Sequence, residues 1–174
     1  YDPINDRFVV VMLAGFSSDA TTIIVAATDS NDAAGDWSMY TLPGNPFEIN
    51  TWSDYPMITM TEESLYLTIN LIYDDEPWET GFRETLIWKM SLEELYAGTA
   101  LNTELISDIK FEGSPIRNVC PVQYATEERS NEVHFLSNRN FDLENDTIFY
   151  VKLIESPDSS ILSASISPLI SDFP

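Results

Sequence analysis

The sequence predicts an all-β protein built from short antiparallel strands, and two observations support this prediction. Runs rich in Val, Ile, Thr, Tyr and Phe are separated along the whole chain by clusters of Asp, Asn, Ser, Gly and Pro, which is the pattern of strands joined by turns. Similar apolar segments also recur at a nearly constant spacing. The 174 residues, 44% of them hydrophobic, suffice for one domain with a sizeable core.

Strands are expected over most of the chain, with short connections between them. They cover residues 7–15, 21–28, 37–42, 55–61, 64–73, 84–90, 106–112, 119–125, 132–137, 147–154 and 163–170. Residues 91–98 give the one helical signal, because Ser91 can cap a helix start, Glu94 stands three residues later as in a capping box, and Gly98 can end it. At this length the helix is one or two turns within a connection.

The internal repetition divides the chain into three units. Apolar segments begin at Thr22, Thr85 and Thr147, which lie 63 and 62 residues apart, and each follows another apolar strand. We therefore expect an incomplete unit over residues 1–50 and further units over 51–113 and 114–174. The first unit is expected to lack its first strand, so that the chain begins inside a unit.

The third strand of each unit is apolar at nearly every position, which is typical of a strand covered on both faces. Four-stranded sheets covered in this way are the blades of a β-propeller, which we predict; a β-sandwich, the alternative, would show more alternation and no such repeat. About three blades are fewer than the roughly four to eight of a closed ring. The chain is therefore expected to be part of a larger propeller, completed by remaining blades of the same protein or by another chain.

The charge balance excludes some classes of partner. Asp and Glu number 29 against 8 Lys and Arg, which gives a net charge of −21. Such a surface repels nucleic acid and anionic membranes, and the apolar runs are too short to insert into a bilayer. The acids are spread along the chain, which favours a solvated surface; the alternative is a surface that binds cations or a basic partner.

The order of these elements resembles a family of secreted bacterial β-propeller repeat proteins. The matching stretches are residues 1–8, 24–29, 35–40, 52–56, 65–70 and 92–98. The resemblance as a whole covers residues 1 to about 155. It implies an extracellular or cell-surface propeller, often of undefined activity. Our first hypothesis is therefore a non-enzymatic module that serves protein or carbohydrate interaction or the assembly of a surface structure.

The stretch from Ser30 to Trp37 also resembles the Asp-box turn of sialidase-like propellers. Ser30, Asp32 and Trp37 match the motif, while Gly35 falls one position late. The resemblance implies a structural turn between strands. From the residues themselves, we expect Asp32 to accept backbone hydrogen bonds, Gly35 to adopt a positive φ and Trp37 to bury its ring between blades. The spacing of the acidic residues in this stretch does not match the EF-hand pattern. Calcium could therefore bind only at a site of another kind, and we expect no cofactor.

A second acidic cluster is the candidate ligand site. It consists of Asp74, Asp75, Glu76, Trp78 and Glu79, which are expected in a solvated loop; carboxylates beside a Trp are also suited to a carbohydrate or a cation. A glycoside-active propeller enzyme of the sialidase type is the alternative function, but it needs converging arginines, and the five arginines are dispersed in the sequence. The single His134 and single Cys120 are interpreted as strand residues, so no catalytic residue and no metal site is assigned.

Overall fold

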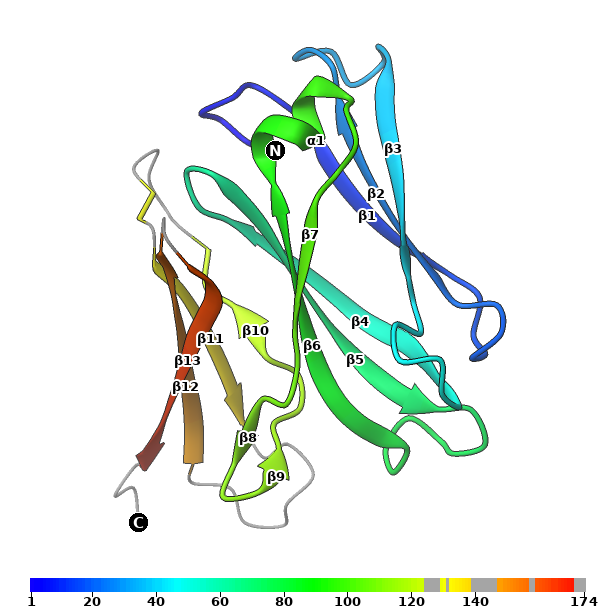
Figure 1. Cartoon of the computed structure of the whole chain (residues 1–174), viewed down its shortest axis with the longest axis vertical. Helices are drawn as coiled ribbons and strands as arrows, with labels where there is room; N and C mark the ends of the chain where they lie inside the picture. Colours follow the sequence, from blue (N-terminus) through cyan, green and yellow to red (C-terminus); the bar gives the residue numbers. More distant parts are fainter. Residues whose placement is uncertain (124–128, 131, 139–146, 157–158, 171–174) are drawn as a thin grey trace.

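The computed structural model describes the backbone of residues 1–123, 129–130, 132–138, 147–156 and 159–170, and side chains in these ranges up to Leu153. Three antiparallel sheets dominate it, which confirms the predicted all-β class (Figure 1). In each sheet, neighbouring strands are consecutive in the sequence. The sheets are therefore meanders joined by turns, and each is formed from one continuous stretch of chain.

The first sheet has three strands: β1 (Val9–Ala14), β2 (Thr22–Thr28) and β3 (Trp37–Pro43). The β-branched residues of β1 and β2 favour the extended backbone. Gly15 has φ of 77° and begins the turn toward β2, where a Cβ atom would collide with the carbonyl oxygen of Ala20. All three strands were predicted within two residues of their ends.

The second sheet has four strands: β4 (Thr51–Met60), β5 (Ser64–Tyr73), β6 (Phe82–Ser91) and β7 (Thr103–Ile106). The predicted bounds of β5 are confirmed. A bulge between Asp54 and Met57 gives Tyr55 a φ of 57° and turns its side chain into solvent. The sequence prediction started this strand at residue 55, whereas β4 begins at Thr51 and continues across the bulge.

Helix α1 (Leu92–Ala97) interrupts the second sheet between β6 and β7, as predicted. The side chain of Ser91 accepts a hydrogen bond from the backbone N–H of Glu94, and Gly98 closes the helix with φ of 67°. Leu92 and Leu95 are the buried side chains of this helix, and they extend the core beneath it.

The third sheet contains β10 (Cys120–Pro121), β11 (Glu132–Asn138), β12 (Thr147–Ser156) and β13 (Ser159–Ile170). A small hairpin of β8 (Lys110–Phe111) and β9 (Ser114–Pro115) precedes it. The single strand predicted over residues 106–112 is wrong. Positive φ values at Asp108 and Glu112 break it, so that its start belongs to β7 and its end to the hairpin. Residues 124–125, expected at the end of a strand, lie outside the described residues.

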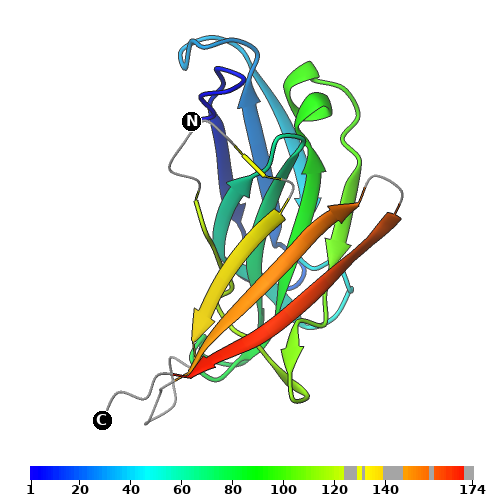
Figure 2. The ribbon, with the colours of Figure 1, turned by 90° about the vertical axis from the view of Figure 1, so that its left-hand side faces the viewer.

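The sheets stack face to face with the second sheet in the middle (Figures 1 and 2). Leu65, Leu67 and Trp88 of the second sheet pack with Val25 of the first. The opposite face of the second sheet contributes residues such as Ile87 to a second core with the third sheet. Strands β5 and β6 are consequently buried on both faces, as the sequence predicted for β6.

The repeated segments occupy the same place in the strand order, but the second one presents the opposite face to the first and the third. Ile24 lies on the side of β2 that faces away from the core, Ile87 faces the third sheet, and Phe149 faces back toward the second sheet. Since a shift of one residue exchanges the faces of a strand, the spacings of 63 and 62 residues preserve the order of strands without preserving their register.

Replacement of Leu67 by Ala tests the packing between the first two sheets. Leu67 is 0% exposed, so the lost contacts and the remaining cavity are expected to lower the free energy of unfolding by about 2–5 kcal/mol. Urea denaturation followed by tryptophan fluorescence measures this change. Leu136→Ala is the control, because Leu136 is 42% exposed and its replacement should cost less than about 1 kcal/mol. Equal costs would contradict the described core.

Candidate functional site

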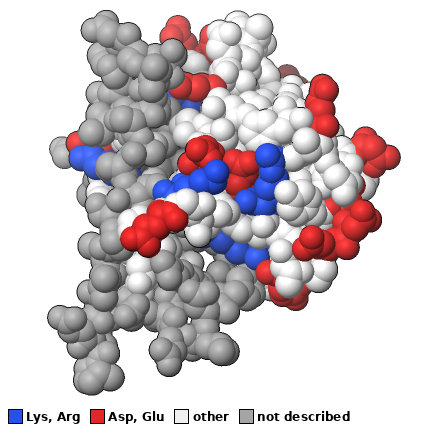
Figure 3. Space-filling view, turned by 60° about the horizontal axis from the view of Figure 1, so that its bottom comes forward, with Lys and Arg blue, Asp and Glu red and all other residues white. Residues whose placement is uncertain are grey.

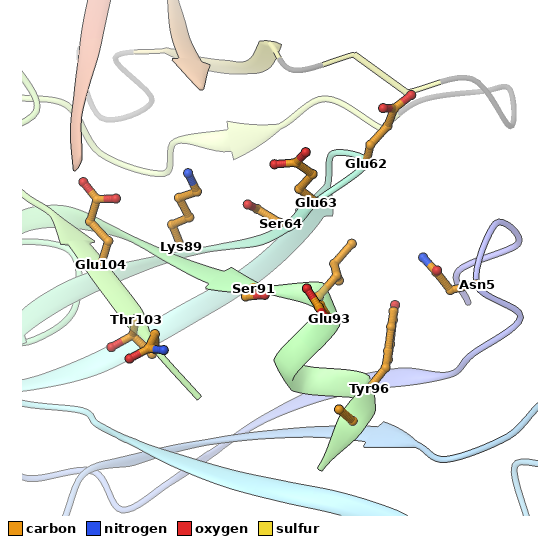
Figure 4. A pocket seen from close by; sticks show the side chains of 13 residues that line it. Asn5, Glu62, Glu63, Ser64, Lys89, Ser91, Glu93, Tyr96, Thr103 and Glu104 are labelled. Atoms are coloured by element: carbon orange, nitrogen blue, oxygen red, sulfur yellow. The ribbon is translucent and has the colours of Figure 1, made fainter. Parts of the chain in front are cut away.

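A cleft of about 920 Å³ lies at the α1 end of the second sheet (Figure 4). Its walls come from the turn between β4 and β5, the end of β6, helix α1, the start of β7 and the N-terminal segment. The lining residues are Asn5, Glu62, Glu63, Ser64, Lys89, Ser91, Leu92, Glu93, Tyr96, Ala97, Asn102, Thr103 and Glu104. Its volume is within the range of protein ligand sites, and most of its lining residues are of polar or charged types.

The tight turn between β4 and β5 places two of the acids. The backbone N–H of Thr61 donates to the carbonyl oxygen of Ser64 at 2.9 Å, and the N–H of Ser64 donates back to the Thr61 hydroxyl at 3.0 Å. Glu62 and Glu63 are therefore exposed at the tip of the turn. The N–H of Leu92 donates to the carbonyl oxygen of Glu63 at 2.9 Å, which fixes the start of α1 against this turn.

Acidic side chains outnumber basic ones in the cleft. Four glutamates line it, at positions 62, 63, 93 and 104, together with Lys89. Lys89 and Glu104 are cross-strand partners on β6 and β7. The neighbouring Glu94 is used structurally, since its carboxylate accepts hydrogen bonds from the backbone and side-chain nitrogens of Asn102 at 2.8 and 2.6 Å.

A buried ion pair supports the wall of the cleft near Tyr96. Asp2 is 0% exposed and its carboxylate accepts a hydrogen bond from Arg129 at 2.6 Å, while the Arg129 side chain is 7% exposed. Tyr96 and Asn5, which both line the cleft, donate to the second carboxylate oxygen at 2.6 and 2.9 Å. The backbone N–H groups of Ile4 and Asn5 complete the set at 3.0 and 3.3 Å.

This environment keeps Asp2 ionised. Burial by itself would raise the pKa of Asp2, but the hydrogen bonds from Arg129, Tyr96 and Asn5, together with the charge of Arg129, lower it to about 2. Burial and the hydrogen bond to Asp2 raise the pKa of Tyr96 well above its usual value. Tyr96 therefore remains a neutral hydroxyl whose proton is donated to Asp2, and it positions α1 rather than acting as an acid or base.

The predicted ligand cluster lies in the connection between β5 and β6, and its acids have separate roles. Asp74 accepts two hydrogen bonds from the backbone N–H of Ser18 at 2.8 and 3.0 Å, which links this connection to the turn between β1 and β2. Asp75 accepts a hydrogen bond from Asn50 at 3.4 Å, and Glu76 is exposed.

At the other end of this connection, the guanidinium group of Arg117 lies 5.5 Å from the centre of the Trp78 ring and 5.1 Å from that of Phe82. Arg117 also donates hydrogen bonds to the carbonyl oxygens of Trp78 and Glu79. These contacts attach the connection to the segment that precedes β10, and they give the cluster a role in joining sheets. Whether it binds a ligand remains a prediction.

The Asp-box-like stretch forms the turn between β2 and β3. Asp32 accepts a hydrogen bond from the N–H of Ala34 at 2.9 Å, as expected, and receives one at its carbonyl oxygen from Gly35 at 3.0 Å. The N–H of Asp32 lies 3.4 Å from the Ser30 hydroxyl. Gly35 lacks the positive φ that we expected, and Trp37 remains partly exposed, with its indole N–H donating to the carbonyl oxygen of Ala33 at 3.1 Å.

The single histidine and cysteine lie on strands of the third sheet. His134 stacks on Tyr150, whose hydroxyl lies 2.7 Å from its Nδ1 atom. The Cys120 thiol is partly exposed and donates to the carbonyl oxygen of Asn118, and burial raises its pKa. These contacts account for both side chains without assigning chemistry to them.

Charges are paired at the end of the molecule opposite α1, which Figure 3 shows as neighbouring basic and acidic side chains. Arg83 lies 3.5 Å from Glu84, and Lys110 forms an ion pair with Asp108. These two ion pairs offset part of the negative charge at this end.

Sequence analysis did not find the cleft, although three of its glutamates lie in two segments that it identified, a turn and a short helix. Glu62 and Glu63 belong to a turn, and Glu93 belongs to the short helix. Pairing of β5, β6 and β7 brings them to the same end of the sheet, and only this pairing places Glu104 beside Lys89.

Comparison with known proteins gave no match: no family model, no curated protein and no solved structure matches this chain.

Among the described residues, His, Cys, Asp and Glu form no group of three or more suited to a metal ion. The same part of the chain contains no helix of the length and hydrophobicity needed to cross a membrane.

Replacement of Asp2 by Asn tests the buried ion pair through its pH dependence. At pH 7 the variant should lose about 3 kcal/mol of unfolding free energy, because Arg129 remains buried without its counter-ion. The pKa of Asp2 is about 2 in the folded protein and 3.8 in the ordinary carboxyl group. The stabilisation by Asp2 is therefore complete above pH 4 and is lost as the pH falls through 2.

Denaturant titrations at several pH values measure this effect as the difference in unfolding free energy between the original protein and the variant. Asp36→Asn is the matched control, because Asp36 is exposed in the turn before β3. Its replacement should leave the dependence of the unfolding free energy on pH unchanged. A difference for Asp2→Asn that stays constant down to pH 2 would show that its ionisation does not stabilise the fold.

Proposed function

We propose that this chain is a non-enzymatic interaction module that binds a basic segment of a partner protein in the cleft at the α1 end. The observation that carries the proposal is the cleft itself, in which four glutamates surround a space of about 920 Å³ beside one lysine. A lysine- or arginine-rich segment would match this charge, and the net charge of −21 would attract it over a longer range.

We further propose that the three stacked sheets are consecutive blades of a β-propeller. Support comes from the meander order in each sheet and from the burial of the second sheet between its neighbours. In this proposal, further blades of the same protein or of another chain continue the stack. The extracellular or cell-surface location follows from the resemblance to secreted propeller proteins and is part of the same proposal.

A basic protein segment fits the cleft better than a carbohydrate does. Carbohydrate sites use the faces of aromatic rings together with hydrogen-bonding groups, and Tyr96, the one aromatic side chain among the lining residues, is hydrogen-bonded to Asp2. The carboxylates at positions 62, 63 and 93 are exposed, so ammonium or guanidinium groups can reach them.

The described arginines have separate positions, which gives no support to a sialidase-type enzyme. Arg129 is paired with Asp2, Arg117 lies on Trp78 and Phe82, and Arg83 lies over Phe47 and beside Glu84. The fourth, Arg7, donates to backbone carbonyl oxygens of its own segment. Arg139 lies outside the described residues.

Binding of a fluorescein-labelled decalysine peptide, followed by fluorescence anisotropy, tests the proposed site. The double variant Glu62→Gln/Glu63→Gln should weaken binding about 5- to 10-fold at an ionic strength of about 0.15 M, because each carboxylate contributes roughly 0.5–0.7 kcal/mol at an exposed site. Lys89→Gln should strengthen binding, since it removes a positive charge from the cleft.

The control must distinguish binding in the cleft from attraction of the peptide by the net negative charge of the chain. Asp36→Asn/Glu48→Gln removes the same two charges from residues outside the cleft and should change the affinity less than 2-fold (about 0.4 kcal/mol). Equal weakening by the two double variants would mean that decalysine responds only to the net charge, and the proposed site would be wrong.

A further inference from the structure

Strand β1 forms one edge of the first sheet, and its backbone is paired on one side only. The N–H of Thr28 donates to the carbonyl oxygen of Phe8 at 3.0 Å, so Phe8 and every second residue after it direct their backbone groups toward β2. The residues between them, Val9, Val11 and Leu13, direct their N–H and carbonyl groups away from β2. Within the described part of the chain, these backbone groups have no hydrogen-bond partner.

The free edge of β1 has the character of a paired edge. Val9 is only 9% exposed, and buried backbone groups are nearly always hydrogen-bonded because they have lost their contacts with water. The side chains of Val11 and Leu13 are partly buried at the rim of the first core. Free edges usually carry a charge, a Pro or a bulge that discourages pairing, and the sequence VVVMLA of β1 with its regular register has none of these.

The N-terminal segment already forms the first pair along this edge. The N–H of Asp2 donates to the carbonyl oxygen of Arg7 at 2.8 Å, and the N–H of Arg7 donates to that of Asp2 at 3.2 Å, so the two residues are an antiparallel pair. Tyr1 is then opposite Phe8, and the centres of their rings lie 5.0 Å apart. Arg7 and Val9 direct their backbone groups to the same side, so the backbone at Tyr1 runs antiparallel to β1 along its free edge.

The second and third sheets show which strand occupies the corresponding place. Each has four strands in sequence order, and its first strand, β4 or β10, pairs with the free side of its second strand, β5 or β11. The first sheet has three strands, and β1 precedes β2 as β5 precedes β6 and β11 precedes β12. A strand in the place of β4 and β10 would therefore pair with the free edge of β1.

We propose that the free edge of β1 takes up a fourth strand, formed by residues of the same protein that lead into Tyr1. The pair of Asp2 and Arg7 sets its register: the residue directly before Tyr1 pairs with Val9, and those two and four positions further back pair with Val11 and Leu13.

The register also defines the chemistry of the fourth strand. Side chains opposite Val9, Val11 and Leu13 lie on the side of the first core and are expected to be apolar, whereas the residues between them face away from it. The proposal deepens the proposed propeller by one strand, and it does not involve the acidic cleft.

Hydrogen exchange resolved by residue with NMR tests the proposal on the chain with an N-terminal extension. The extension Thr-Val-Thr-Val-Thr-Val places its valines opposite Val9, Val11 and Leu13. It should slow the exchange of these three amide hydrogens about 10-fold, as expected of one or two hydrogen bonds. The amide hydrogens of Val10 and Met12 are already directed toward β2 and should be slowed by a smaller factor.

The extension Thr-Pro-Thr-Pro-Thr-Pro is the matched control, because Pro has no N–H to donate to the carbonyl groups of β1. It should leave the exchange of Val9, Val11 and Leu13 close to that of the original chain. Equal slowing by the two extensions, or no slowing by the first, would overturn the proposal, since the edge would then accept no strand. Either result leaves the decalysine test of the cleft unaffected.

Discussion

The buried ion pair between Asp2 and Arg129 links the segments that lead into the first and third sheets to helix α1 of the second sheet. Two charges removed from water cost several kcal/mol each unless their hydrogen bonds are replaced, and the Asp2 carboxylate replaces them with five donors. These donors come from the N-terminal segment, from α1 and from the segment before β11. Because the geometry is satisfied only when all three segments are in place, this interaction holds Tyr96 of α1 and supports one wall of the cleft.

The chain accommodates its strong net negative charge by distributing charge unevenly over its surfaces. Ion pairs such as Arg83–Glu84 and Lys110–Asp108 offset part of the charge at the end that contains the hairpin, and the cleft at the other end holds four glutamates beside one lysine. The strands of the first sheet carry no charge. The fold thus separates a charged surface from an apolar one.

Local sequence signals predicted most of the secondary structure. Features that depend on pairing between distant strands could not be predicted from the sequence. The bounds of β5 and the caps of α1 are encoded by neighbouring residues, so the sequence was sufficient for them. The error at residues 106–112 arose because Asp108 and Glu112 adopt positive φ values that their residue types do not require. The cleft could not be predicted, because Glu62, Glu93 and Glu104 become neighbours only when β5, β6 and β7 pair in register.

The meander order of the sheets also has a consequence for how the chain folds. Each sheet uses one continuous stretch of sequence, so its strands can pair after closing only short loops, and such local contacts form quickly. The contact between Asp2 and Arg129 instead spans 127 residues and must wait until distant parts of the chain have been ordered. Amide hydrogens within the sheets should therefore become protected early during refolding, and the ends of the stack should acquire their final packing last.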